Sequence, residues 1–444
     1  MTTLVLGSGL DAILYISNLI KNGTTVTHFA KSKILGGHFR GLKTNHGYVD
    51  AGMVLLENDH RGISPKLLDS FEDEFGVSTR PFLRECFSWL EISMGEFSNI
   101  EIFTKIADST LVSDFFISDS LEVLKRLPES LKNQIIEISK SNLEVELSHR
   151  HPKNKLSLDT IGLESFLMSQ FGRETYEVLF KSFLEKLLLS RTDLIPVKDH
   201  RKVWAPLYFP ESILWELTGE KCYERYSLEC LKFLKPKNQS VAGWLHSLID
   251  EISHSPLYTF IEAEQQSLQE TLINAKQMEI TSFLQVQEIC ESFGLMNLDT
   301  QSRKVEGSPI LLAHYCIDEE DSKVIFDSDP QSPILRQSIS KDNSRDSHSN
   351  ALFELGGGDS EIDTLTSYLK RHGQLAKCEG NWRKLHFSPR VTKIDANDWE
   401  LYRLELKTQL EKFRIDGPIP HPEATSFNDH LVRGLSWSKR SGVL

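Results

Sequence analysis

Two glycines near the start of the chain are spaced as in a turn that holds a dinucleotide. Gly7 and Gly9 open the pattern Gly-x-Gly-x-x-Ala, which lies between a β-rich run, Thr3 to Leu6, and a helical pattern, Leu10 to Lys21. In such a turn the first glycine permits the bend, the second lets the backbone approach a diphosphate, and the small Ala12 lets the helix pack closely on the strand. Amides at the helix N-terminus then face phosphate oxygens. The alternative is a glycine-rich turn that binds nothing.

One residue expected beside this turn is missing. A second strand is predicted from Thr24 to Ala30, after the Asn22-Gly23 turn. In a dinucleotide site this strand usually ends with an acid that accepts hydrogen bonds from the adenosine ribose. Ala30 occupies that position. We therefore expect either another ribose-binding group or weak binding.

The remaining chain predicts a mixture of helices and strands. From about Ile63 to Lys140 the pattern is mostly helical, the region from Thr281 to Phe326 contains short β segments, and Asp327 to Ser360 is rich in Ser, Asp and Asn and predicts loops. Further helices are predicted at 173–189, 241–252, 361–371, 399–413 and 428–437, and further strands at 257–263, 310–316 and 351–355.

Composition excludes several classes of protein. The 444 residues include 50 Lys and Arg against 63 Asp and Glu, a formal charge of −13, which argues against a broad nucleic-acid footprint. The sequence shows no secretory signal and no apolar run of membrane-spanning length, so we expect a cytoplasmic location. The six cysteines have no CxxC spacing, and His149-x-His151 has no further ligands nearby, so we expect no metal.

Two blocks of sequence resemble one group of flavoproteins. Residues 34–41 (Ile-Leu-Gly-Gly-His-Phe-Arg-Gly) and 47–52 (Gly-Tyr-Val-Asp-Ala-Gly), together with the Phe-Gly-Arg segment within Ser165 to Leu187, are similar to the FAD-dependent superfamily of amine oxidases, protoporphyrinogen oxidases and UDP-galactopyranose mutases. The resemblance implies an α/β fold: a discontinuous Rossmann-like FAD-binding domain with a mixed α+β substrate domain. We expect the FAD domain in residues 1–60, about 234–290 and about 383–444, and the substrate domain in 61–233 and about 291–382.

The resemblance also implies the site residues. FAD would contact the following residues in the glycine-rich segments 7–12, 34–41 and 47–52: Gly7, Gly9, Leu10, Ala12, Gly36, Gly37, Arg40, Asp50 and Gly52. Arg173 and Arg336 would bind substrate, with Arg336 also acting in catalysis, and His38 would serve as a base near the flavin. Tyr208 would line the substrate cleft, or else anchor the core. For Arg173 the alternative is a surface ion pair with Glu177, four residues on.

Three functions remain open on this resemblance. The leading hypothesis is an FAD-dependent oxidoreductase of the protoporphyrinogen oxidase-like or amine oxidase-like group, acting on a small metabolite. The second is a redox-neutral nucleotide-sugar mutase. The third is a degenerate, non-catalytic protein that keeps the fold as a binding or scaffold module. A homo-oligomer and a partner protein are left open by the sequence.

Overall fold

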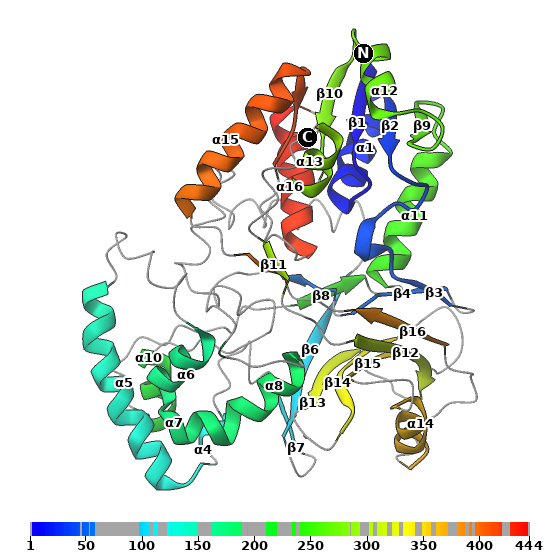
Figure 1. Cartoon of the computed structure of the whole chain (residues 1–444). Coiled ribbons are helices and arrows are strands. Elements are labelled where there is room, and N and C mark those ends of the chain that lie inside the picture. Colours follow the sequence, from blue (N-terminus) through cyan, green and yellow to red (C-terminus); the bar gives the residue numbers. More distant parts are fainter. Residues whose placement is uncertain are drawn as a thin grey trace.

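The strands that the structure describes form two large sheets and two small ones (Figure 1). The computed structural model describes residues 2–44, 47–52, 54–57, 97–106, 110–113, 122–125, 127–149, 162–188, 193, 210–219, 233–236, 240–284, 286–293, 302–304, 309–317, 322–327, 332–341, 349–356, 361–371, 381–386, 390–392, 396–419 and 427–442. Within these ranges no helix combines the length and apolar character needed to cross a membrane.

The first large sheet is parallel throughout and is assembled from distant parts of the chain. Its strands are β1 (Thr2–Leu6), β2 (Thr25–Ala30), β9 (Tyr258–Glu262), β10 (Glu279–Ser282) and β18 (Ile415–Asp416), in the order β18-β10-β1-β2-β9. In chain order the sheet therefore reads 5-4-1-2-3, the doubly wound arrangement of nucleotide-binding folds. Ligands of such sheets bind outside the carboxyl ends of the strands, where the strand order reverses. Here that point lies between β1 and β10.

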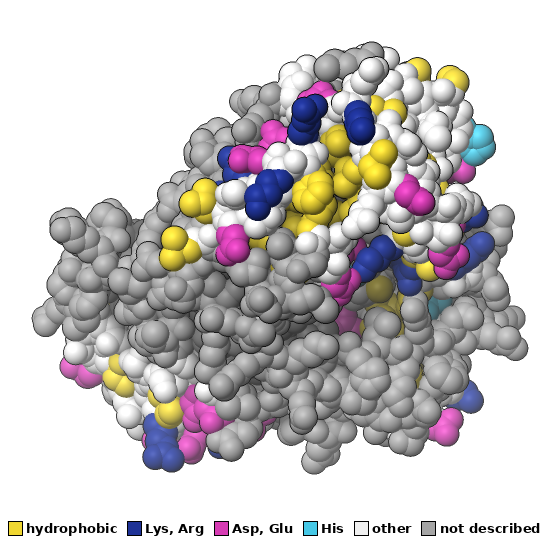
Figure 2. All heavy atoms as spheres, turned by 45° about the horizontal axis from the view of Figure 1, so that its top comes forward, with side chains coloured by type: hydrophobic (Ala, Val, Ile, Leu, Met, Phe, Trp, Pro, Cys, Tyr) yellow, Lys and Arg dark blue, Asp and Glu magenta, His cyan; other side chains and the backbone are white. Residues whose placement is uncertain are grey.

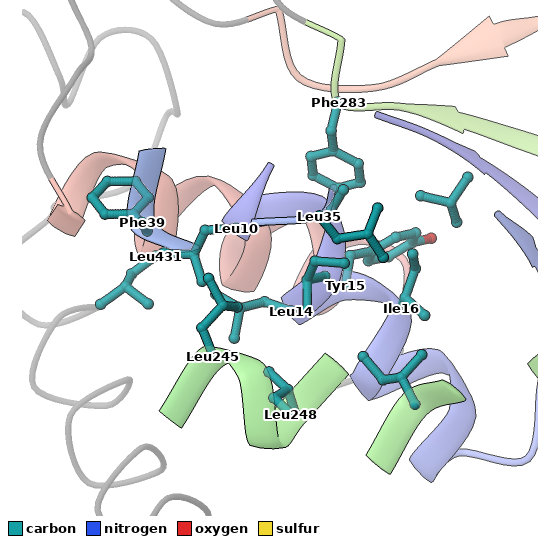
Figure 3. Close-up of a cluster of buried hydrophobic side chains, with 14 of the residues drawn as sticks. Leu10, Leu14, Tyr15, Ile16, Leu35, Phe39, Leu245, Leu248, Phe283 and Leu431 are labelled. Atoms are coloured by element: carbon teal, nitrogen blue, oxygen red, sulfur yellow. The ribbon is translucent and has the colours of Figure 1, made fainter. Parts of the chain in front are cut away.

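Helices cover both faces of this sheet because its strands bury side chains in both directions. Val5 of β1 belongs to a core shared with α1 (Leu10–Lys21), α11 (Val241–Ser253) and α16 (Phe427–Arg440), shown in Figure 3. Leu4 and Leu6 belong to the opposite core, formed with α12 (Leu268–Asn274), α13 (Val286–Phe293) and α15 (Ala396–Lys412). Alternation along one strand thus fills two layers. Each fully buried leucine adds about 2 kcal/mol of hydrophobic stabilisation.

The second large sheet is mixed and has one apolar face. Its strands run in the order β16 (Asn381–His386), β12 (Pro309–Ile317), β15 (Ser349–Gly356), β14 (Ile334–Lys341), β13 (Lys323–Asp327), β6 (Phe97–Ile106), β8 (Phe233–Pro236) and β5 (Leu56–Glu57), with β7 (Thr110–Ser113) paired to β6. Alternate residues such as Ala313, Phe353 and Leu355 pack under α14 (Glu361–Arg371). The opposite face meets Leu42 and Ala51 of the N-terminal segment.

Smaller elements complete the molecule. A hairpin joins β3 (Leu42–Thr44) to β4 (Gly47–Val49), and β11 (Ser302–Lys304) pairs with β17 (Arg390–Thr392). A separate group of helices comprises α4 (Glu122–Lys125), α5 (Glu129–His149), α6 (Leu163–Phe171), α7 (Arg173–Thr175), the π-helix η3 (Tyr176–Lys181), α8 (Ser182–Leu188) and α10 (Pro210–Thr218) (Figure 1). Together α7, η3 and α8 cover the helix predicted at 173–189.

The structure refines three sequence-based predictions of elements. The described part of residues 327–360 is mainly strand and not loop, because β14 and β15 lie there at the centre of the nine-stranded sheet. The described part of the region from 63 to 140 contains the helices α4 and α5, as predicted, and also the strands β6 and β7. The β segments predicted between 281 and 326 are present as β11, β12 and β13, and the helix α13 lies in the same region.

The predicted domain boundaries stay a prediction, and three strands bear on where the segments meet. β5, β8 and β16 lie in the nine-stranded sheet, although residues 56–57, 234–236 and 383–386 fall in predicted FAD-domain segments. The five-stranded sheet and its helices draw instead on the first 30 residues, on residues 241–293 and on residues 396–440.

Candidate functional site

The glycine turn lies where the sheet order reverses, between β1 and α1. Gly7 has φ +119°, and a Cβ there would stand 3.0 Å from the backbone carbon of Phe283, so a side chain would be both strained and crowded. Gly9 caps α1 in an extended conformation without a side-chain hydrogen bond. Gly9 therefore places no side chain over the start of α1, although the Asp11 carboxylate accepts from the amide of Ala12 in this first turn at 3.1 Å. The side chains of Leu10 and Ala12 lie in the core.

A buried histidine of the neighbouring strand is hydrogen-bonded to the backbone of this turn. His28 of β2 is fully buried, with Nε2 2.7 Å from the carbonyl oxygen of Gly7 and Nδ1 2.7 Å from the Tyr258 hydroxyl. A carbonyl only accepts, so Nε2 donates its hydrogen to Gly7 and Nδ1 accepts from Tyr258. Burial lowers the pKa of His28 to about 4, which keeps the ring neutral at pH 7. One sequence signal could have indicated this role: a histidine inside a predicted strand that contains no charged residue.

The double-glycine segment is joined directly to the first turn. Gly36 is left-handed (φ +93°), and its amide donates to the carbonyl oxygen of Ser8 at 2.7 Å. Gly37 is also left-handed (φ +58°) and begins a 3₁₀ turn, η1 (Gly37–Arg40), with open space where its Cβ would be. The structure thus brings together the two glycine motifs that were recognised separately in the sequence.

Two other predicted residues lie on this 3₁₀ turn. The carbonyl oxygen of Arg40 accepts from His246 at 3.0 Å. His38 is exposed, yet the surrounding protein and the neighbouring His430 lower its pKa to about 4. The imidazole is therefore neutral at pH 7 and a weaker base than an ordinary histidine.

A buried ion pair connects the start of α1 to the last helix. The carboxylate of Asp11 is fully buried, 2.7 Å from Nη1 of Arg433 and 3.4 Å from Nδ1 of His430, both on α16. Burial alone would raise the pKa of Asp11, but Arg433 and His430 outweigh it and lower the pKa to about 2. Asp11 also accepts from the amide of Ala12. Asp11 and Arg433 are 422 positions apart in the sequence, and their pairing was not predicted.

Asp50 has a structural partner set. Its carboxylate accepts from the amides of Val241 and Ala242 at the start of α11, at 3.3 and 2.7 Å, and lies 2.9 Å from Nζ of Lys235. Both carboxylate oxygens of Asp50 thus already have partners in the protein. Contact between this side chain and the cofactor stays a prediction. Asp50 instead fixes the segment that leads to Gly52.

Gly52 faces the second sheet at a buried ion pair. It has φ +110°, and a Cβ there would lie 3.3 Å from Oε1 of Glu354 and 3.6 Å from Nη2 of Arg336. Arg336 donates through Nε to Glu354 at 2.9 Å and also through Nη2, and its guanidinium lies 5.6 Å from the Phe326 ring centroid. Arg336 of β14, which was predicted to bind substrate, thus has its positive charge balanced by Glu354, its register partner on β15.

Beside this ion pair lies a small polar cavity. It has a volume of about 10 Å³, room for about one water molecule, and is lined on the sheet side by Ser338, Ser340 and Asn350. The Ser338 hydroxyl is buried and has no hydrogen-bond partner. The cavity is too small for a metabolite. Leu352 also lines it, so this face of the sheet carries both polar and apolar side chains where it meets the segment from Val49 to Gly52.

The other predicted substrate residues do not join this group in the described ranges. Arg173 is 81% exposed, and its Nε donates to Glu177 at 3.2 Å, so the surface ion pair considered as its alternative is present. Its role toward substrate stays a prediction. Tyr208 lies outside the described residues. No group of three or more His, Cys, Asp or Glu side chains suited to a metal occurs among the residues the structure describes.

Comparison with solved structures identifies the fold. A reduced UDP-galactopyranose mutase matches 100% of this chain and 94% of its own, with a TM-score of 0.60 and 12% identity. A putative protoporphyrinogen oxidase from Exiguobacterium sp. 255-15 matches 99% of this chain and 98% of its own, with a TM-score of 0.56 and 11% identity. This chain shares their fold.

The shared fold confirms the fold that the resemblance of the glycine motifs implies. A double mutant of putrescine oxidase also matches, over 100% of this chain and 99% of its own, with a TM-score of 0.51 and 9% identity. No protein-family profile and no curated protein sequence matches the chain. At these identities the likeness is one of fold, so activity has to be argued from the residues of this chain.

Proposed function

We propose that the protein binds FAD across the glycine turn and acts as a flavin-dependent oxidoreductase on a small metabolite. The observation that supports this most is the hydrogen-bonded joining of two glycine motifs, Gly7–Gly9 and Gly36–Gly37, at the reversal point of a doubly wound sheet. The absence of a side chain at Gly9 and the open space at Gly37 fit the approach of a diphosphate.

The residues divide into a cofactor side and a substrate side. Gly7, Gly9, Gly36 and Gly37 would hold the dinucleotide, and the nine-stranded sheet would face the substrate at Gly52, where Arg336 and Glu354 lie. When bound, the isoalloxazine supplies the electron-accepting chemistry. His38, neutral and on the η1 turn, would accept a proton from the substrate.

A matched pair of glycine variants tests the cofactor site. Gly37 and Gly23 are both exposed, left-handed and open where a Cβ would stand, so alanine imposes similar strain at each. Gly23 lies in the turn after α1, away from the proposed site. We expect Gly37→Ala to weaken FAD binding at least tenfold in a fluorescence titration and Gly23→Ala to leave it unchanged. Equal affinities for both variants and the wild type would refute the placement of the cofactor.

A redox-neutral nucleotide-sugar mutase is the second candidate, favoured by the match over nearly the whole length of UDP-galactopyranose mutase. That function needs cations to hold a diphosphate. Arg336 is paired with Glu354, so it would have to leave this partner or share it. Dithionite-reduced protein incubated anaerobically with a panel of UDP-sugars separates the two: isomerised sugar without net flavin oxidation supports the mutase, and no isomerisation leaves the oxidoreductase.

The non-catalytic alternative makes a simpler prediction. Ala30 in place of the usual ribose acid is the observation that favours it. A protein that is colourless when purified, and that takes up no FAD during refolding or titration, would remove both enzyme proposals and leave this one.

A further inference from the structure

A carboxylate on the neighbouring strand lies beside Ala30. In the parallel pairing of β2 with β9, Ala30 is the register partner of Glu262. Register partners on adjacent parallel strands point to the same side of the sheet and are about 5 Å apart. Ala30 has only a methyl group, so the longer Glu262 side chain has room beside it. An acid therefore stands one strand away from the position where the fold usually places one.

The Glu262 carboxylate is held in place, with acceptor capacity left over. Its side chain is 13% exposed, and Oε1 accepts from the amide of Lys33 at 3.0 Å. Oε2 lies 3.8 Å from Nζ of Lys33, whose side chain is 72% exposed, so this second contact is weak. A carboxylate has about four acceptor positions. Oε2 can therefore accept from a ligand hydroxyl while Oε1 keeps its backbone contact.

The loop that Glu262 anchors leads directly to the glycine turns. Lys33 is three residues before Gly36, whose amide donates to Ser8. Glu262 thus fixes one end of a short segment whose other end is fixed to the glycine turn. A ligand lying over Gly9 toward the end of β2 would have its adenosine end near this segment.

We propose that Glu262 replaces the missing acid at Ala30 and accepts the hydrogen bonds of the adenosine ribose hydroxyls. The inference rests on the proposed function, because it concerns the adenosine end of the same dinucleotide. It also sets a specificity. A carboxylate in this place repels a 2′-phosphate, and Lys31, the nearby cation after β2, is bonded to Glu291 at 2.8 Å. The site should therefore select an unmodified ribose.

The test uses the full-length apoprotein and ADP, which carries the adenosine half of FAD. Glu262→Gln keeps an oxygen for the Lys33 amide but removes the charge that strengthens hydrogen bonds from ribose. Calorimetric titration should show ADP binding weakened about tenfold in this variant. Glu264→Gln, an exposed acid two residues further on, is the matched control and should bind as the wild type does.

Ligand analogues make the assignment specific. Against the wild type, 2′-deoxy-ADP or 3′-deoxy-ADP should bind about tenfold more weakly than ADP, and adenosine 2′,5′-bisphosphate should bind worst. Against Glu262→Gln the penalty for the missing hydroxyl should largely disappear, because the two losses remove the same contact. Thermal melting of each variant shows whether the fold is kept.

The outcomes separate this inference from the proposed function. If wild type and Glu262→Gln bind ADP and FAD equally, or if the deoxy penalty persists in the variant, the role of Glu262 is refuted and FAD binding stands. If the wild type binds neither ADP nor FAD, both proposals fall together.

Discussion

Asp11 and Arg433 form an ion pair that is almost completely excluded from water. The Asp11 side chain is fully buried and that of Arg433 is 1% exposed, so neither charge can be solvated if its partner is lost. Asp11→Asn should therefore lower the free energy of unfolding by about 3–5 kcal/mol. The double variant Asp11→Leu with Arg433→Met should lose less than the sum of the single variants. Urea denaturation measures all of them, and single variants within about 0.5 kcal/mol of the wild type would contradict the account.

The Asp11–Arg433 pair also makes the stability of the fold decrease in acid. The folded-state pKa of Asp11 is about 2, below the ordinary value of 3.8. A lowered carboxyl pKa stabilises the fold above pH 4, and that stability is lost as pH falls toward 2. The contribution is about 2 kcal/mol. Comparison of unfolding free energies of wild type and Asp11→Asn from pH 5 to pH 2 should show the curves converging, whereas parallel curves would argue against it.

His28 predicts a second and higher window of acid sensitivity. Its pKa is lowered from 6.5 to about 4, so the unfolded chain takes up a proton that the folded chain refuses. The folded state should lose up to about 3 kcal/mol of relative stability between pH 6.5 and pH 4. His28→Asn has no titrating group and should be less stable at pH 7 but flatter across this range. A variant with the same pH dependence as the wild type would exclude His28 as the cause.

At the scale of elements, α1 and α16 approach each other at a glycine. A Cβ at Gly434 would lie 2.7 Å from the backbone oxygen of Asp11 and 3.2 Å from Cβ of Leu14, so Gly434→Ala must move one helix away from the other. We expect a loss of about 1–3 kcal/mol in unfolding free energy. Leu404→Ala in α15, where the leucine is 62% exposed, is the control and should change stability little. A tolerated alanine at 434 would mean that this contact is looser than described.

The elements also show which predictions a sequence permits. The opening strand, helix and strand were predicted to within one residue at each end, because glycine turns and apolar spacing agree there. β15 was predicted in part, as a strand at 351–355, whereas β14 was missed because polar residues occupy one of its faces: Arg336, Ser338 and Ser340 alternate with residues that face the core. That face of the sheet meets the N-terminal segment, which explains its polar residues. In the sequence alone, a strand with so many polar residues has the composition of a loop.

At the candidate site, the sequence permitted prediction of the glycines but not of the partners of the charged side chains. The glycine positions were predictable because left-handed backbone and close approach require glycine whatever the rest of the fold does. The partners of Asp11, Asp50 and Arg336 were not, because Arg433, Lys235 and Glu354 reach them only through tertiary packing. A charge in a sequence does not show whether its partner is a ligand or another side chain.

At the scale of the whole molecule, the proposed cofactor side draws on segments near both ends of the chain. β1 and α1 come from the first 21 residues, while α16 comes from the last 18, and all three lie in the same upper part of the structure (Figure 1). Figure 2 shows hydrophobic and charged side chains intermingled on this end, where α15 exposes Leu401 and Leu404. A dinucleotide bound at the turn would stabilise the assembled state of these distant segments.

Reconstitution with FAD is therefore the most direct measurement. Purified full-length protein, incubated with excess FAD and passed through gel filtration, is predicted to keep one flavin per chain, to show a protein-perturbed flavin spectrum and to melt at a higher temperature than the apoprotein. A colourless protein fraction whose melting temperature does not change at saturating FAD would contradict the account.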